Sequence, residues 1–269
     1  MLVGDLDEIV RALMRVNKKK CFQRTLWLIA VLALAADAQA VVLYDGSLNT
    51  LPAAQGWRYV SNPFSGSSAT QAASGGAVTL DTTAVGTEQA GYFSQFPVLG
   101  SHPAMPTLDR TAGFTIRFDA RIVSESHQSL NRAGFSVIAL ASDSQGLELG
   151  FWPGEVWAQT DSPLFTHGEG AAWNTAAMHR YELAMRGSQY ALYADGSRIL
   201  QGSLRNYSSF GFPYNLSSFL FFGDDTSSAS ASMQVASIEV LAYAVPEPGT
   251  LTLAAAAIFV LPLFARRQR

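Results

Sequence analysis

Several segments in the middle of the chain alternate between apolar and polar residues with a period of two. From Ala112 to Val123, one side carries Phe114, Ile116 and Phe118 and the other carries Thr115, Arg117 and Asp119. Such alternation predicts β-strands with one face toward a core. Gly134 to Ala141 is instead an apolar run, which predicts a strand buried on both faces.

Turn signals separate these segments at short intervals. Tyr181 to Arg186 and Gln189 to Ala194 flank Gly187-Ser188, which predicts a hairpin, and Asp195-Gly196 predicts a tight turn into the segment Arg198 to Leu204. Met233 to Tyr243 is a final alternating run. Because no heptads and no long helical periodicity interrupt this pattern, the sequence predicts an all-β domain, an antiparallel β-sandwich or jelly roll.

The N-terminal part has the pattern of a secretory signal. Basic residues from Arg15 to Arg24 precede an apolar run from Leu26 to Ala36, and Ala38 and Ala40 form an A-x-A cleavage site before Val41. The acidic residues 1–13 make an odd preface, so Met14 is the expected translation start. The alternative to a cleaved signal helix is an uncleaved N-terminal anchor.

The C-terminal part combines a short motif, an apolar run and a basic end. Pro246, Glu247 and Pro248 precede the apolar stretch Leu251 to Ala265, and the basic residues Arg266, Arg267 and Arg269 follow it. The stretch is shorter than the roughly 20 residues of a typical membrane-spanning helix. With snorkelling arginines it could still span, and those arginines would then remain cytoplasmic.

These C-terminal residues closely resemble the PEP-CTERM sorting signal. The resemblance implies recognition near Pro246 to Pro248 by an exosortase-type transpeptidase, in bacteria that make exopolysaccharide. It implies localisation at the cell envelope, the outer surface or the extracellular matrix, after transient anchoring in the inner membrane by a C-terminal hydrophobic helix. An ordinary single-pass anchor is the alternative.

The sequence divides into three expected parts, a signal peptide at residues 1–40, a β-sandwich domain at 41–243 and a sorting segment at 244–269.

The composition excludes some functions for the predicted domain. With 14% charged residues and a net charge of -3, the chain offers no broad basic surface for nucleic acid. The single cysteine, Cys21, precedes the apolar run, so the mature domain would hold no thiol and no disulfide.

Three stretches of the predicted domain resemble concanavalin A-like (laminin G-type) sandwich modules. They are LYDGSLNTLPAAQGW, YALYADGSRILQG and FLFFGDDTSSASASMQVASIEVLAY. The resemblance implies two curved sheets, often with a ligand-binding concave face, and it implies the fold rather than an activity.

A hairpin between Leu147 and Thr160 is the most informative segment for function. With Pro153-Gly154 as its turn, one face carries Leu149, Phe151, Val156 and Ala158, and the other carries Glu148, Trp152, Glu155, Trp157 and Gln159. Tryptophan rings beside hydrogen-bonding side chains are typical of sugar-binding surfaces. Gly150, opposite Trp157, would leave room for a sugar ring. The alternative is that both tryptophans pack beneath a loop.

Catalytic and metal-binding patterns are weak. Glu148 and Glu155 would lie roughly 13 Å apart along the strands, which is too far for a glycosidase pair. Metal-ligand spacing is absent among the histidines His102, His127, His167 and His179. The sequence also contains no G-x-S-x-G motif that would supply a serine nucleophile. Asp224 and Asp225 are weak candidates for a structural Ca²⁺ site, and a solvated turn is the alternative.

The sequence therefore predicts an exported, non-enzymatic β-sandwich module without a cofactor. Carbohydrate or exopolysaccharide binding through the Trp152 and Trp157 face is the leading hypothesis. A structural or adhesive matrix protein and a glycan-active hydrolase are the two alternatives.

Overall fold

Residues 40–62 and 68–242 are described by the computed structural model. The expected signal helix, the C-terminal hydrophobic helix and the sorting motif around Pro246, Glu247, Pro248, Arg266 and Arg267 lie outside these residues. The described part consists of β-strands and three short 3-10 helices, η1 (Gly46–Leu48), η2 (Pro52–Gln55) and η3 (Ser208–Phe210). None of its helices has the length and apolar character needed to cross a membrane.

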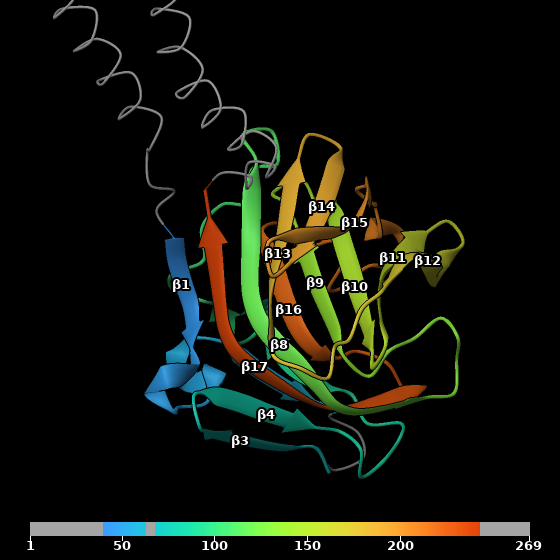
Figure 1. Cartoon of the computed structure of the whole chain (residues 1–269). Helices are drawn as coiled ribbons and strands as arrows, with labels where there is room; N and C mark the ends of the chain where they lie inside the picture. Colours follow the sequence, from blue (N-terminus) through green and yellow to red (C-terminus); the bar gives the residue numbers. More distant parts are fainter. Residues whose placement is uncertain (1–39, 63–67, 243–269) are drawn as a thin grey trace, which may run out of the picture. The chain divides into compact units, whose positions relative to one another are not determined.

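The strands form two main antiparallel sheets that pack as layers (Figure 1). The first sheet has the order β15 (Ser197–Ser203), β14 (Gln189–Ala194), β13 (His179–Arg186), β8 (Phe114–His127), β17 (Ala229–Leu241), β4 (Ala77–Asp81) and β3 (Thr70–Ser74). In addition, β1 (Ala40–Asp45) pairs with the second half of β17. The long strands β8 and β17 curve along their length and give the layer its bend (Figure 1).

The second sheet carries the residues that matter for function. Its order is β12 (Leu164–Ala172), β11 (Glu155–Asp161), β10 (Gly146–Trp152), β9 (Ser136–Leu140), β16 (Phe219–Asp224), β5 (Ala90–Phe93) and β2 (Arg58–Ser61). A separate ribbon joins β6 (Gln95–Phe96) to β7 (Gly100–Ser101) beside it. The prediction of an all-β antiparallel sandwich is confirmed.

The main core lies between the two sheets and follows the predicted alternation. Phe114, Ile116 and Phe118 of β8 point into it, as predicted, and Phe118 meets Phe151 of β10 edge-on with 6.1 Å between ring centroids. Every residue of β9 is buried, which confirms the prediction of a strand covered on both faces. Burial of these apolar faces is the main driving force for sheet packing.

The predicted hairpins have the expected registers. Arg186 pairs with Gln189, and Ala194 pairs with Ser197 across the turn Asp195-Gly196. Both residues of that turn have positive φ values, 49° and 76°, as a two-residue hairpin turn of type I′ requires. An aspartate and a glycine tolerate this conformation, so the dipeptide fixes the turn.

The described domain begins and ends side by side. Ala40 at the start of β1 pairs with Leu241 at the end of β17, and Val41 pairs with Val240. The chain therefore enters and leaves the sandwich at neighbouring positions on the same sheet.

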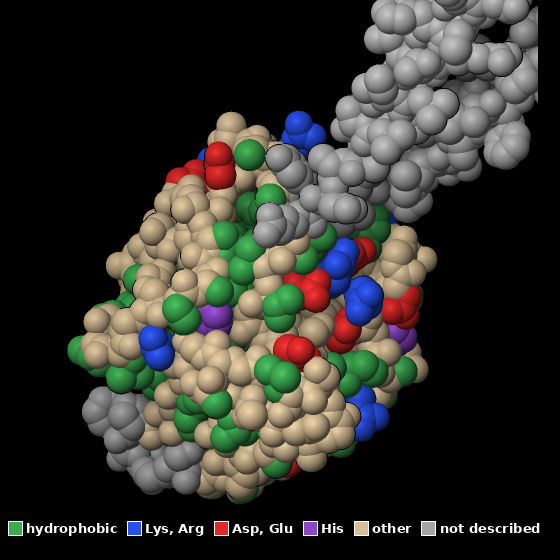
Figure 2. All heavy atoms as spheres, turned by 90° about the vertical axis from the view of Figure 1, so that its left-hand side faces the viewer, with side chains coloured by type: hydrophobic (Ala, Val, Ile, Leu, Met, Phe, Trp, Pro, Cys, Tyr) green, Lys and Arg blue, Asp and Glu red, His purple; other side chains and the backbone are tan. Residues whose placement is uncertain are grey.

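Charged side chains on the first sheet are paired across strands. Arg117 of β8 contacts Glu182 of β13 at 2.9 Å and Glu239 of β17 at 3.2 Å, and Arg180 contacts Asp119 at 2.9 Å. On the face shown in Figure 2, positive and negative side chains are likewise interspersed in a mostly uncharged surface.

Candidate functional site

The predicted tryptophan hairpin has the predicted register. Trp152 pairs with Glu155, Phe151 with Val156, Gly150 with Trp157 and Leu149 with Ala158. The core face is also confirmed, because Leu149, Phe151, Val156 and Ala158 all belong to the main core.

The opposite face of this hairpin is not the open sugar platform that the sequence suggested. Trp157 and Glu148 are 0% exposed, Gln159 is 1% exposed, and Trp152 and Glu155 are half-buried. The prediction of an exposed binding face at Glu148, Trp152, Glu155, Trp157 and Gln159 is therefore wrong. The alternative, that the tryptophans pack beneath other segments, is correct.

Contacts from distant segments explain this burial. The ring of His167 in β12 stacks on Trp157 with 4.2 Å between centroids and 12° between planes. Gln159 donates a hydrogen bond to the Asn131 carbonyl at 2.9 Å, and Trp152 donates one to the Arg132 carbonyl at 2.9 Å. The segment 129–132 and β12 thus cover the sheet where a sugar was expected. Trp157 itself fills the space over Gly150, since a Cβ there would lie 2.6 Å from the indole.

Each histidine of the described domain packs against at least one tryptophan. The contacts are Trp57 with His102, Trp152 with His127, both Trp152 and Trp157 with His167, and Trp173 with His179. The ring nitrogens of these histidines contact backbone or carboxylate groups; His179, for example, lies 2.6 Å from Asp195. The four histidines therefore contribute to packing, and within the described residues they belong to no group of three or more side chains that could hold a metal ion.

Glu148 and Glu155 have separate partners. Glu155 contacts His167 at 3.2 Å, whereas Glu148 accepts a hydrogen bond from Tyr214 and contacts Arg132 at 3.4 Å. Because Glu148 is completely buried, its carboxyl group cannot touch a substrate. The two glutamates are not a glycosidase pair.

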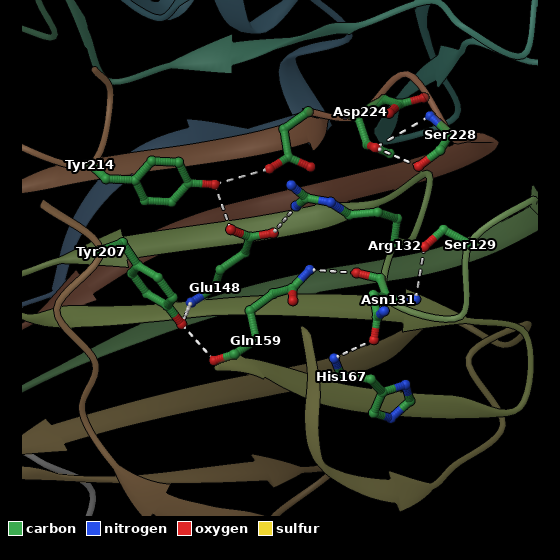
Figure 3. A network of polar contacts seen from close by, with 12 residues as sticks. Ser129, Asn131, Arg132, Glu148, Gln159, His167, Tyr207, Tyr214, Asp224 and Ser228 are labelled. Atoms are coloured by element: carbon green, nitrogen blue, oxygen red, sulfur yellow. Dashed lines mark hydrogen bonds and ion pairs between the residues drawn. The ribbon is translucent and has the colours of Figure 1, made fainter. Parts of the chain in front are cut away.

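Glu148 is part of a polar network beneath the outer face of the second sheet (Figure 3). The Tyr214 hydroxyl lies 2.5 Å from Glu148 Oε2 and 3.2 Å from Asp225 Oδ2. Burial, together with the charge of Asp225, raises the pKa of Glu148 to about 8. The Arg132 guanidinium lies over the Phe165 ring, 4.6 Å from its centroid, so both aromatic and carboxyl groups hold it in place.

A groove of about 480 Å³ opens over this network, and it is the best candidate for a functional site. Its apolar lining comes from the outer faces of β5, β9 and β16 and from the loop after η3. The aromatic residues are Phe93, Phe96, Phe165, Phe210, Phe212, Tyr214 and Phe221, and the polar residues are Ser61, Asn62, Gln89, Arg132, Asp224 and Asp225. A second buried cluster, which includes Ile138, Phe219 and Tyr207, supports its floor.

Two of the phenylalanines in the groove are open to solvent. Phe210 is 56% exposed and Phe212 is 41% exposed, although large apolar side chains are usually buried. Phe212 meets Phe96 edge-on at 5.3 Å, and its ring is nearly parallel to that of Phe93. The rings therefore hold one another in fixed orientations.

Sequence reasoning missed this groove. Its one local signal is the run Phe210-Gly211-Phe212-Pro213-Tyr214, which places three aromatics beside Gly and Pro. Aromatic residues between turn-forming residues indicate a loop that presents rings. The opposite wall comes from residues 60–62 and 89–96, which no sequence pattern connects to that loop.

Asp224 and Asp225 do not form the suggested Ca²⁺ site within the described residues. Asp224 accepts hydrogen bonds from the Thr82 hydroxyl at 2.6 Å and the Thr226 amide at 3.1 Å. Burial raises the pKa of Asp224 to about 9. The described residues contain no group of three or more histidine, cysteine or acidic side chains that could hold a metal ion.

The fold and groove together define a β-sandwich protein with an aromatic-lined groove on one sheet. No protein-family model matches the chain. No curated protein matches it either.

Several solved structures are similar to this chain at low sequence identity. A carbohydrate esterase from the Shiga toxin-encoding bacteriophage phi24B is 16% identical, with 70% of this chain and 90% of that chain covered and a TM-score of 0.47. A botulinum neurotoxin type C structure, described as interacting with two ganglioside molecules, is 10% identical over 74% of this chain and 46% of that one, with a TM-score of 0.44. A Trypanosoma rangeli sialidase is 14% identical over 66% of this chain and 27% of that one, with a TM-score of 0.42. The function must therefore be argued from this chain's own residues.

Proposed function

We propose that this chain is an exported, concanavalin A-like β-sandwich protein that binds carbohydrate in the aromatic groove. The single observation that carries the proposal is the braced aromatic lining of the groove beside polar side chains. The exposed Phe212 packs edge-on against the half-buried Phe96, and the exposed Phe210 packs against Phe165 and Tyr214. A pyranose ring has an apolar C–H face and a rim of hydroxyl groups, so it matches aromatic rings beside polar side chains.

The dimensions of the groove support a small portion of a glycan chain as the ligand. Its volume of about 480 Å³ lies within the range of roughly 300–1,000 Å³ that is usual for small-ligand sites. The floor is supported by the buried network of Glu148, Arg132 and Tyr214, which limits rearrangement on binding.

We include export and surface sorting in the same proposal. The support is the signal-like N-terminus and the Pro246-Glu247-Pro248 motif followed by an apolar run and Arg266-Arg267. Cleavage after Ala40 would leave Val41 to Asp45 in β1, so the mature chain would keep this strand. The partners are then an exosortase-type transpeptidase and an extracellular polysaccharide.

A structural or adhesive matrix protein is the remaining alternative. The exposed phenylalanines would then contact another protein rather than a sugar. Hydrolysis is not part of the proposal, because Glu148 is sealed beneath the groove and Glu155 is bound to His167 elsewhere on the sheet.

The groove is tested with the purified full chain in a detergent that has no sugar headgroup. Electrophoresis through gels that contain different soluble polysaccharides should show retardation by at least one polymer. The double variant Phe96→Ala, Phe212→Ala should lose this retardation by about tenfold or more in apparent affinity, because it removes both ring faces. Leu48→Ala is the control, since Leu48 is an exposed apolar residue in η1 outside the groove. Equal retardation of both variants and the wild type would contradict the groove assignment.

Sorting is tested separately in a bacterium that has an exosortase. Replacing Pro246, Glu247 and Pro248 by alanine should leave an unprocessed chain in the inner membrane, whereas the wild-type domain reaches the surface or the medium. Identical mass and location of the two products would contradict the sorting proposal and leave the groove untouched.

A further inference from the structure

The aromatic wall of the groove consists almost entirely of phenylalanine. Six phenylalanines line it, and among the described lining residues the seventh aromatic side chain is that of Tyr214. The Tyr214 hydroxyl belongs to the buried network, where it donates a hydrogen bond to Glu148 (Figure 3) and also contacts Asp225. Since a phenylalanine ring has no hydrogen-bonding group, this wall offers apolar surface to a ligand.

The phenylalanine rings lie in two groups. Phe93 packs against Phe96 and Phe212, with 5.5 and 6.3 Å between the ring centroids. Phe210 packs edge-on against Phe165, with 4.9 Å between centroids. Phe210 and Phe212 are nevertheless 56% and 41% exposed, so each group presents apolar surface to a ligand.

Several polar side chains that line the groove are already bound within the protein. Gln89 donates a hydrogen bond from Nε2 to the Asp225 carbonyl at 3.0 Å. Asp224 accepts hydrogen bonds at both of its carboxylate oxygens. Arg132 contacts Glu148 at 3.4 Å. The hydroxyl groups of a ligand would have to compete with these contacts.

A phenylalanine wall discriminates between a hydroxyl group and an apolar group at the same position of a sugar. A hydroxyl group that faces a ring loses its hydrogen bonds to water and gains none in return, which costs free energy. An O-acetyl group removes that hydroxyl donor and adds a methyl group, whose burial against the rings is favourable.

We infer that the groove prefers glycans whose sugars carry O-acetyl groups over the same glycans with free hydroxyl groups. This rests on the proposed carbohydrate function and names its class of glycan. The C–H face of the sugar ring and the methyl group of its substituent then both contact phenylalanine.

The wild-type test uses pairs of neutral polymers that differ only in acetylation. Galactomannan, β-glucan and dextran are each compared with a partly O-acetylated, soluble derivative, by gel retardation of the full chain at pH 7 in a detergent without a sugar headgroup. Random partial acetylation samples every hydroxyl position and adds no charge. A polymer that retards the chain should do so about tenfold more strongly in its acetylated form, the lower end of the discrimination that one apolar group gives in a hydrophobic pocket.

Two substitutions of nearly equal size at Phe212 separate apolar contact from ring stacking. Phe212→Asn places an amide beside the ligand, so affinity for the acetylated polymer should fall to that for its parent. Phe212→Leu removes the ring but keeps an apolar side chain, so affinity for both forms should fall together and the preference should remain. Phe210→Asn repeats the test in the second group of rings. Both phenylalanines are exposed, so we expect these variants to fold, and thermal melting checks this.

The outcomes separate the inference from the proposed function. Equal retardation by the acetylated and parent forms would overturn the inference while leaving the carbohydrate function in place. An unchanged preference in both asparagine variants, or its loss in Phe212→Leu, would also overturn it, because apolar contact would then not be the cause. Absence of retardation by every polymer in both forms would remove the carbohydrate function itself, and the inference with it.

Discussion

Trp157 lies under His167, with their rings stacked 4.2 Å apart and only 12° from parallel. In the neighbouring strands β11 and β12, Trp157 pairs with Gly170 and His167 pairs with Gln159, and a register shift lies between these two pairs. The irregular register places the imidazole over the indole. Trp157 is thereby sealed from solvent, and its indole nitrogen has no hydrogen-bond partner.

Replacing His167 by alanine should open this side of Trp157 to water. We expect a shift of tryptophan emission to longer wavelength and stronger quenching by acrylamide. His167→Phe is the matched control, because it keeps a flat ring over Trp157 while losing the contact with Glu155. If both variants shift the emission equally, the contact of His167 with Glu155, rather than the stacked ring, shields Trp157.

Replacing Trp157 by alanine should reduce stability and leave glycan selectivity unchanged. A buried tryptophan truncated to alanine typically costs about 3–5 kcal/mol in the free energy of unfolding. The groove is lined by other residues, so a folded Trp157→Ala chain should still be retarded by the same polysaccharide. Denaturant unfolding and gel retardation measure the two effects. If the Trp157→Ala variant unfolds like the wild type but is no longer retarded, the sugar-binding site lies at the hairpin and not in the groove.

The sequence could predict the hairpin but not its surroundings. Pro153-Gly154 sets the turn, and the alternation of Leu149 and Phe151 with polar residues sets the core face, so the register follows from local information. Burial of the other face depends on segments such as 129–132, which carry no periodic pattern. The sequence of the hairpin therefore does not determine whether its second face is exposed to solvent or covered. Tertiary contacts with other segments determine this.

The groove was hidden from sequence reasoning for a related reason. Its aromatic rings come from strand ends and loops that are more than one hundred residues apart, as Phe96 and Phe212 show. From the sequence alone, each of these phenylalanines would be predicted to lie in the hydrophobic core. Only the exposed fraction of Phe212 in the folded chain distinguishes a binding surface from a core.

Stability should decrease as the pH rises through the neutral range, because of Glu148. Its pKa is raised from 4.5 in an unfolded chain to about 8 in the folded one. Between these values the folded state holds more protons than the unfolded state, so the free energy of unfolding falls with increasing pH. The slope for one such group is at most about 1.4 kcal/mol per pH unit.

The contribution of Glu148 is isolated by comparison with Glu148→Gln. Both chains contain the same other titrating groups, including Asp224, whose raised pKa acts in the same direction. Urea unfolding between pH 5 and pH 8 should show a steeper loss of stability for the wild type than for the variant. Parallel curves for the two chains would show that Glu148 titrates at its ordinary value.

Gly150 should tolerate no side chain, because the indole of Trp157 occupies the space above it. A Cβ at Gly150 would lie 2.6 Å from one indole carbon and 2.7 Å from the next, closer than real contacts allow. Gly150→Ala must therefore displace Trp157 or bend β10, and we expect a loss of about 1–3 kcal/mol in the free energy of unfolding. The displaced indole should also become accessible to acrylamide. Gly154→Ala is the matched control in the same hairpin, since a Cβ there meets nothing within 4 Å. Equal stability of the two variants would mean that Trp157 moves aside without cost, and that a sugar ring could then enter over Gly150 after all.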